Sequence, residues 1–245
     1  QMVRHLFMKV SPFALAVLIA SSAGASGLDD FRAALRRSES GPQVRARIEV
    51  VIQEQTKGEK KPDSGPTRAS VVARTGPDGF ALEWEMAKLA ALRKVSQKSL
   101  RKHLEAITAM EALRLVDPAP HLLSALDGAT LLEEKTDRHD GVPCRRLLIR
   151  PERKPDPEID PLLKEFEASW QVWIDADGWP LAMKTEQRHR GRKLLISFKG
   201  SHETEYRFGR AAGRLIVERL KEVSSSEAMG SEDEETSEFT VTLLD

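Results

Sequence analysis

Histidine and cysteine, the side chains best suited to holding a metal, are few and scattered in this chain. The sequence holds one cysteine, Cys144, so neither a cysteine cluster nor an intramolecular disulfide can form. No histidine pair has the i, i+4 spacing of a helical zinc motif with its intervening glutamate. We therefore expect no metal and no cofactor. The histidines that follow the N-terminal segment are His103, His121, His139, His189 and His202.

Residues that could carry out catalysis form no known motif. Asp175 and Asp177 lie two apart in an Asp-Ala-Asp-Gly sequence, which is typical of a tight turn. The chain contains no G-x-S-x-G, no phosphate-binding loop and no dinucleotide glycine fingerprint. Cys144 precedes an apolar run, which favours a buried or edge-strand thiol. We expect no enzyme activity; a hydrolase would need His139, His189 and the dispersed carboxylates to meet in one cleft.

The densest cluster of positive charge surrounds Gly191, which we interpret as the tip of a hairpin. Its side chains are candidates for contact with lipid headgroups or an acidic protein, and the alternative is a solvated turn. Lys and Arg together number 38, as do Asp and Glu, so the chain lacks the positive excess of nucleic-acid-binding proteins. The cluster comprises Arg188, Arg190, Arg192 and Lys193.

Residues 1–25 have the three parts of a secretory signal peptide. A short basic stretch with Arg4 and Lys9 precedes an apolar run over 10–20, and small residues follow at 22–25. The apolar run is too short for a comfortable membrane span, and no later run reaches about 18 residues. No cysteine lies at the cleavage point to accept a lipid. We expect cleavage near Ala25 and a periplasmic protein without a transmembrane segment.

The remainder, 26–245, is predicted to be a single α+β domain. Helical spacing of apolar residues predicts helices at 27–40, 88–115, 118–126 and 162–168. About ten strands, most joined by hairpins, predict a curved antiparallel meander covered by the helical insert at 88–126. Segment 224–238 is polar and acidic, which predicts a flexible loop. Alternating apolar and polar residues predict strands at 44–53, 68–74, 80–86, 129–134, 144–150, 170–175, 181–185, 193–198, 203–208, 214–223 and 239–244.

This order of elements resembles the LolA/LolB-like periplasmic lipoprotein-carrier superfamily over most of the chain. The most specific stretch is 172–181, Val-Trp-Ile-Asp-Ala-Asp-Gly-Trp-Pro-Leu, which is similar to the family's aromatic-x-Asp-x-x-Gly-x-Pro-hydrophobic hairpin. Segments 117–126 and 140–144 are similar to the region that joins the family's helical insert to its sheet. These are turn motifs, so they indicate a fold more than a ligand.

The resemblance implies an incomplete barrel, closed by helices over an apolar cavity that accepts acyl chains. It thereby predicts a carrier of a lipid or an acylated ligand such as a lipoprotein. The same apolar residues would equally fill a dry core, which favours an envelope interaction or sensory module that contacts protein partners. The candidate cavity residues are Ile48, Val50, Phe80, Leu82, Trp84, Leu104, Ile107, Val172 and Ile174.

Overall fold

The fold is seen in a computed structural model, which describes residues 26–38, 43–56, 65–76, 79–153, 160–193 and 196–244. The predicted signal peptide at 1–25 lies outside these ranges. No helix among the described residues combines the length and the apolar character needed to cross a membrane.

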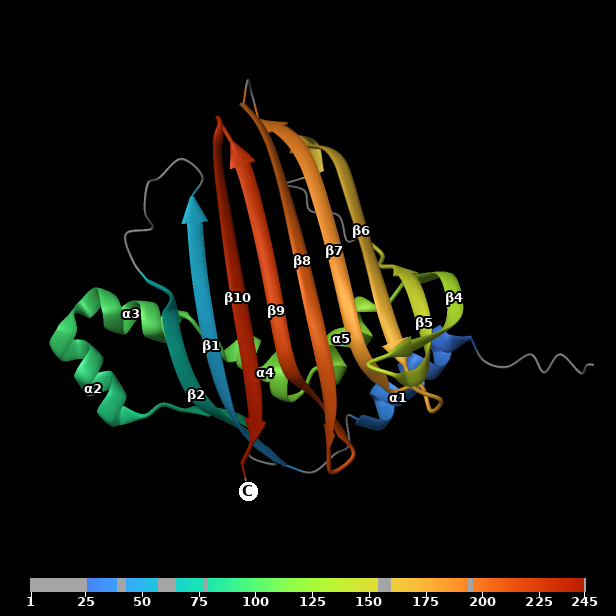
Figure 1. Cartoon of the computed structure of the whole chain (residues 1–245), viewed down its shortest axis with the longest axis horizontal. Helices are drawn as coiled ribbons and strands as arrows, with labels where there is room; N and C mark the ends of the chain where they lie inside the picture. Colours follow the sequence, from blue (N-terminus) through green and yellow to red (C-terminus); the bar gives the residue numbers. More distant parts are fainter. Residues whose placement is uncertain are drawn as a thin grey trace, which may run out of the picture.

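A ten-stranded antiparallel sheet forms the body of the molecule, in the order β3-β2-β1-β10-β9-β8-β7-β6-β5-β4 (Figure 1). Neighbouring strands are consecutive in sequence except at β1 and β10, where the C-terminal strand pairs with the first one. The sheet has two free edges, β3 and β4, so it is curved but not closed into a barrel. The α+β antiparallel meander predicted from the sequence is confirmed. The strands are β1 (Val44–Thr56), β2 (Thr67–Gly76), β3 (Gly79–Glu83), β4 (Thr130–His139), β5 (Val142–Arg150), β6 (Leu163–Ile174), β7 (Pro180–Lys193), β8 (Ile196–Ala211), β9 (Arg214–Ala228) and β10 (Ser231–Leu243).

Alternation of side chains gives the sheet an inner face, which the helices cover, and an outer face. In β1, Val44, Ala46, Ile48 and Val50 are buried while the residues between them are exposed. The register places Val50 opposite Phe239 of β10, so apolar side chains continue from strand to strand. The alternation of apolar and polar residues along the strands therefore places the apolar side chains on the inner face, as the sequence predicts.

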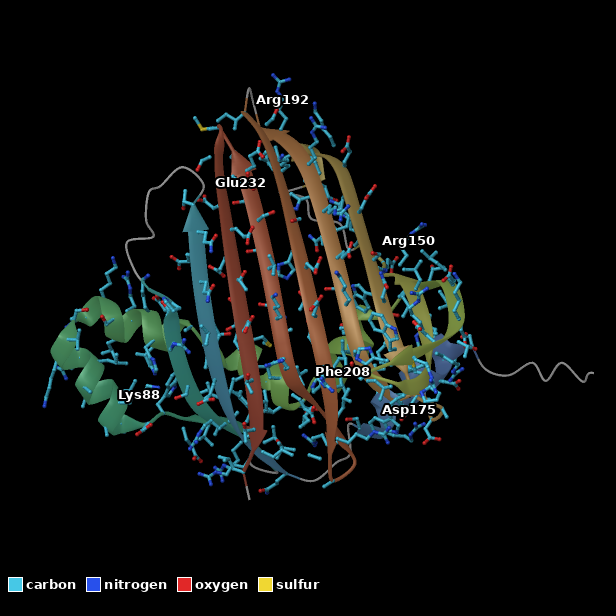
Figure 2. All side chains as sticks on the ribbon, viewed as in Figure 1. Lys88, Arg150, Asp175, Arg192, Phe208 and Glu232 are labelled. Carbon is cyan, nitrogen blue, oxygen red and sulfur yellow. The ribbon has the colours of Figure 1, made fainter. Side chains whose placement is uncertain are left out.

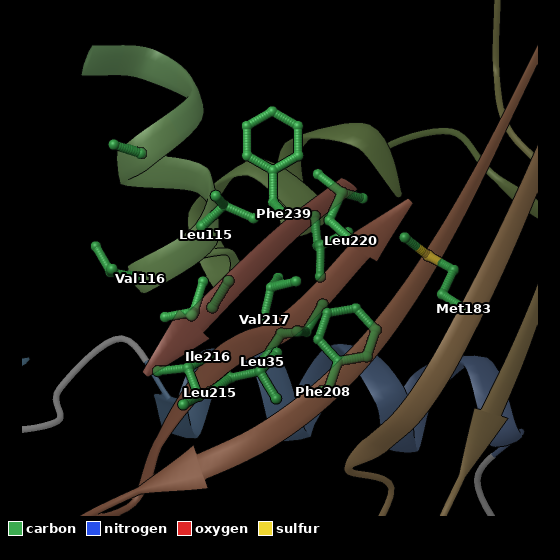
Figure 3. Close-up of a cluster of buried hydrophobic side chains, with 14 of the residues drawn as sticks. Leu35, Leu115, Val116, Met183, Phe208, Leu215, Ile216, Val217, Leu220 and Phe239 are labelled. Carbon is green, nitrogen blue, oxygen red and sulfur yellow. The ribbon is translucent and has the colours of Figure 1, made fainter. Parts of the chain in front are cut away.

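Three helices cover one half of the inner face: α1 (Gly27–Ser38), α4 (Ala109–Val116) and α5 (Ala119–Ala125). Figure 3 shows Leu115 of α4 and Leu35 of α1 among side chains of the sheet, including Phe208 and Phe239. Leu35 is wholly buried and Leu115 is 1 % exposed. We call this packed region the covered half. The strands extend well beyond it, which leaves an open half of the inner face (Figure 1).

The turn between β6 and β7 fastens the sheet to α1. The Asp175 carboxylate accepts hydrogen bonds from the backbone N–H groups of Asp177 and Trp179, both at 2.9 Å. Gly178 has a φ of +83°, and a Cβ atom there would lie 2.5 Å from the Asp30 carbonyl oxygen of α1. Only glycine fits this positive φ beside a neighbouring backbone. The predicted turn role of Asp175 and Asp177 is confirmed.

The helical segment predicted over 88–115 consists of three helices, because the chain breaks it twice. The three helices are α2 (Met86–Val95), α3 (Gln97–Glu105) and α4. Ser96 ends α2 and caps α3, accepting a hydrogen bond from Ser99 N at 2.9 Å, and Thr108 forms a capping box with Glu111 at the start of α4. A side chain that caps a new helix competes with continuation of the previous one. The predicted cover of the sheet is supplied by α4 and α5, whereas α2 contains no buried residue.

Segment 224–238 is not a loop, which corrects the prediction. It forms the end of β9 and the start of β10, and Thr236 pairs with Val223 on one side and Gln53 on the other. Its composition is polar because this part of the sheet lies in the open half, where none of the helices that the structure describes covers either face. A strand with water on both sides keeps its backbone hydrogen bonds but loses the apolar alternation that reveals it.

The helix predicted at 162–168 is also wrong. A short 3-10 turn, η1 (Asp160–Leu162), leads directly into β6, and Phe166 already pairs with His189 of β7. The apolar residues 162, 163 and 166 have helical spacing, but Phe166, Ala168 and Trp170 also follow period two. Residues 163–174 form a strand and not a helix because they pair with β7 along its length. Such tertiary pairing overrides a short local pattern.

Candidate ligand-binding pocket

A large hollow lies on the open half of the inner face, where β6, β7 and β8 extend beyond α5. It has a volume of about 800 Å³. Residues from α5, the end of β5 and η1 form its rim, and the strands form its floor. We call it the aromatic pocket. Its apolar lining consists of Leu162, Leu163, Phe166, Ala168, Trp170 and Phe198, together with Ala125 and Pro151.

Strand register explains why these side chains share one face. Phe166, Ala168 and Trp170 alternate along β6 and so point to the same side of the sheet. Their partners on β7 are His189, Gln187 and Thr185, all of which also line the pocket. Polar side chains of β7 therefore lie between the aromatic side chains of β6 and Phe198 of β8.

Two glycines make room for the rings of the floor. A Cβ atom at Gly191 would lie 2.3 Å from Cζ of Phe198, and one at Gly200 would lie 2.6 Å from Cε1 of His189. The two rings are neighbours, with centroids 6.3 Å apart. Gly191 was predicted to be a hairpin tip; it instead lies within β7, paired with Phe198 of β8. Because Gly191 has no side chain, the Phe198 ring can pack closely against the strand, and the glycine does not form a turn.

An arginine forms part of the rim. The Arg153 guanidinium lies over the Phe166 ring, 4.5 Å from its centroid, and forms an ion pair with Asp160. A cation over an aromatic face is attracted by the ring quadrupole. Arg153 and Asp160 both line the pocket, so this pair joins the end of β5 to η1 across its margin.

A row of polar side chains crosses the sheet beside the pocket. His202, which lines it, has Nε2 at 3.0 Å from the hydroxyl oxygen of Thr204. Thr204 is 2 % exposed and pairs across strands with Glu222, which in turn pairs with Ser237. Burial raises the pKa of Glu222, which the neighbouring His202 opposes. Burial also raises the pKa of Tyr206, one step toward the covered half, to about 12.

Comparison with known proteins adds little to this geometry. No family model and no curated protein matches the chain. Its fold is distantly similar to a solved structure. That structure is a DUF1329 family protein from Desulfovibrio piger, with 10% sequence identity and a TM-score of 0.33 over 88% of this chain and 90% of that one. Likeness at this level transfers neither a family nor a function.

The residues predicted to line a cavity lie elsewhere, and none of them lines the aromatic pocket. Five belong to the packed core of the covered half and are 0–1 % exposed: Ile48, Val50, Ile107, Val172 and Ile174. Leu104 of α3 is 39 % exposed. Phe80, Leu82 and Trp84 are partly buried against the core.

Part of the lining of the pocket could be predicted from the sequence. Phe166, Ala168 and Trp170 alternate with polar residues, and Phe198 stands in a predicted strand. A helix at 162–168 would place Phe166 and Trp170 on different elements, whereas the strand brings both rings to one face of the sheet.

The basic cluster lies on the outer face of β7, away from the pocket. Arg188, Arg190 and Arg192 are exposed. Arg188 and Arg190 lie directly across from Glu167 and Glu165 of β6, so carboxylates border the cluster. Like the pocket, it is near the end of the sheet, but it points to the opposite side. Lys193 ends β7, and its side chain is outside the described residues.

Other reactive groups occupy separate places. His139 lies beside Trp173 on the outer face, with ring centroids 5.3 Å apart, and His103 is buried where α3 meets β2. Among the described residues, no group of three or more His, Cys, Asp and Glu side chains is arranged to hold a metal ion. Cys144 is 6 % exposed on β5, and burial raises the pKa of its thiol.

Proposed function

We propose that this protein is an exported binding or carrier protein that holds an acyl chain in the aromatic pocket. The observation that carries the proposal is a hollow of about 800 Å³ floored by Phe166, Trp170 and Phe198. Ligand pockets commonly measure about 300–1,000 Å³ and are mainly apolar with a few polar groups. Each methylene removed from water there contributes about 0.8 kcal/mol, so a long chain binds without any specific polar contact.

The proposal includes export of the protein to the periplasm and binding of the ligand without catalysis. The signal-like segment at 1–25 supports export to the periplasm. We propose binding without catalysis, because His202 at the pocket's edge is already hydrogen-bonded to Thr204. The resemblance to lipoprotein carriers agrees with this function and suggests a lipid or a lipoprotein as the ligand.

A pair of neighbouring substitutions on β6 tests the proposal. Ala168 lines the pocket, whereas Ser169 points to the outer face. We expect Ala168→Phe to fill the pocket and reduce uptake of a fluorescent fatty acid at least about tenfold, while Ser169→Phe leaves uptake unchanged. Native mass spectrometry of protein purified from the periplasm should detect lipid that is lost in Ala168→Phe. Equal uptake by the two variants, or no uptake by the wild type, would refute acyl-chain binding.

The alternative is an interaction module whose core is filled. The complete burial of Ile48, Val172 and Ile174 favours it, as does the exposed basic cluster on the outer face. In this case, changing Arg188, Arg190 and Arg192 to Ser should reduce recovery of a partner from envelope extracts. Equal recovery of every protein by the wild type and this variant would argue against the module.

A further inference from the structure

Helices α2 and α3 form a hairpin that projects beyond β2 at one side of the sheet (Figure 1). Ser96 is the turn of this hairpin, since it ends α2 and caps α3. No residue of α2 is buried, and Val95 beside the turn is 76 % exposed. Met86 at the start of α2 is 73 % exposed. The hairpin therefore consists of two helices that expose apolar side chains to solvent.

Charge on the hairpin is predominantly positive. Helix α2, MAKLAALRKV, contains seven apolar residues, three basic residues and no acid. Helix α3, QKSLRKHLE, adds three Lys and Arg residues and one carboxylate, Glu105, which pairs with Arg101 at 3.7 Å. Arg93, Lys94 and Lys98 surround the turn, are exposed and have no ion-pair partner among the described residues. The chain as a whole has equal numbers of acidic and basic residues, so this is a local concentration.

The base of the hairpin is fixed to the sheet. His103 of α3 is 3 % exposed, and its Nδ1 lies 3.1 Å from the Arg68 carbonyl oxygen of β2. Because a carbonyl only accepts, this nitrogen donates. The His103 ring also lies beside Trp84, with centroids 5.6 Å apart, and Lys88 Nζ lies 3.0 Å from the Ser70 hydroxyl. Figure 2 shows Lys88 on the side of the hairpin nearest the sheet. The turn thus projects from a firm attachment.

We propose that the α2–α3 hairpin docks the protein on an anionic phospholipid bilayer. Basic helices with exposed apolar side chains lie at lipid interfaces, with the apolar groups among the acyl chains and the cations at the phosphates. Val95 is the apolar side chain at the turn, and Arg93, Lys94 and Lys98 surround it. Exposed, flexible Lys and Arg side chains can contact the many phosphate groups of a lipid surface. A protein–protein interface would instead need a packed apolar centre. This docking is independent of what the aromatic pocket holds.

Charge reversal tests the electrostatic part. Vesicles of phosphatidylcholine mixed with phosphatidylglycerol are compared with vesicles of phosphatidylcholine alone by co-sedimentation. We expect the full chain to bind the anionic vesicles only, and to release them as salt is raised. The triple variant Arg93→Glu, Lys94→Glu, Lys98→Glu should bind at least about tenfold more weakly. The matched control Arg188→Glu, Arg190→Glu, Arg192→Glu makes the same charge change on β7 and should retain most of the binding.

A neutral substitution tests the apolar part. Val95→Ser should weaken binding to anionic vesicles several-fold without any change in charge. Met229→Ser, at a residue 82 % exposed on the β9–β10 turn, is its control. Unchanged thermal unfolding would show that each variant folds. Equal binding to neutral and anionic vesicles, equal losses in the two triple variants, or binding only to an acidic protein would overturn the proposal.

Discussion

The ring of Phe198 lies directly over Gly191 of the neighbouring strand. A Cβ atom at Gly191 would come within 2.3 Å of the ring and within 2.5 Å of the Leu162 carbonyl oxygen. Both contacts are too short for real atoms, so any larger residue must displace the ring or the η1 turn. Gly191 therefore determines where the floor and the rim of the aromatic pocket meet.

Gly191→Ala should deform the pocket while the sheet remains folded. The added methyl group must push Phe198 toward the hollow, at a cost of about 1–3 kcal/mol in the free energy of unfolding. We expect uptake of a fluorescent fatty acid to fall about tenfold in a titration. Gly65→Ala is the control, because a Cβ atom there has no neighbour within 4 Å. Unchanged uptake by Gly191→Ala would show that Phe198 does not shape the ligand site.

A buried hydrogen bond joins α1 to β9 across the core. Leu215 N donates to the Ser38 hydroxyl oxygen at 2.7 Å, and both residues are 0 % exposed. Ser38→Ala would leave the Leu215 N–H group buried without an acceptor, which costs about 1–3 kcal/mol. Urea unfolding should show this loss, whereas Ser197→Ala on the outer face of β8 should change stability by less than about 0.5 kcal/mol. A loss equal to that of the control would mean that water replaces the hydroxyl.

The sequence predicts the covered half of this fold well and the open half poorly. Ile48 and Val50 alternate with charged residues because one side of β1 meets helices and the other meets water. In the open half no described helix covers the inner face, so Ser224 and Glu235 can lie opposite each other there. The alternation of apolar and polar residues then disappears, although the strands remain paired through their backbones. The error at 224–238 follows from this physical difference.

The candidate site depends on packing that no local pattern records. Gly191 between basic residues has the composition of a turn, and only its distance to Phe198 reveals another reason for the glycine. In the same way, the apolar residues of β1 and β6 do not show which of them surround filled space and which surround a hollow. Val172 is 0 % exposed, whereas Trp170, two residues earlier, lines the pocket. The position of α5 along the sheet decides between these outcomes.

Hydrogen exchange distinguishes the strand from the predicted loop at 224–238. Thr236 pairs with strands on both sides, so amides of β10 should exchange slowly, close to the rate set by global unfolding. Amides of α2, which contains no buried residue, should exchange faster than those of β10. Mass spectrometry of peptides from both segments in one experiment gives the comparison. If 231–238 exchanges as fast as α2, the end of the sheet is not stably paired.

Glu222 makes stability depend on pH because its carboxyl group is partly buried. Burial raises its pKa above the ordinary 4.5, Glu111 and Glu235 act in the same sense, and His202 and Arg114 oppose them. The native state therefore binds this proton more tightly than the unfolded chain does. The stabilisation of the native state that protonated Glu222 contributes is fully present below the ordinary pKa of a glutamate. It is lost as the pH rises through the pKa of Glu222 in the native state.

Glu222→Gln should remove this dependence, since glutamine keeps the shape but carries no charge. We expect the variant to unfold at a higher temperature than the wild type at about pH 7.5, and the difference to shrink toward about pH 4. Glu234→Gln on the outer face of β10 is the control and should show no such trend. Thermal unfolding followed by circular dichroism over this range gives both curves. A difference that stays constant with pH would mean that the substitution acts through packing and not through the charge of Glu222.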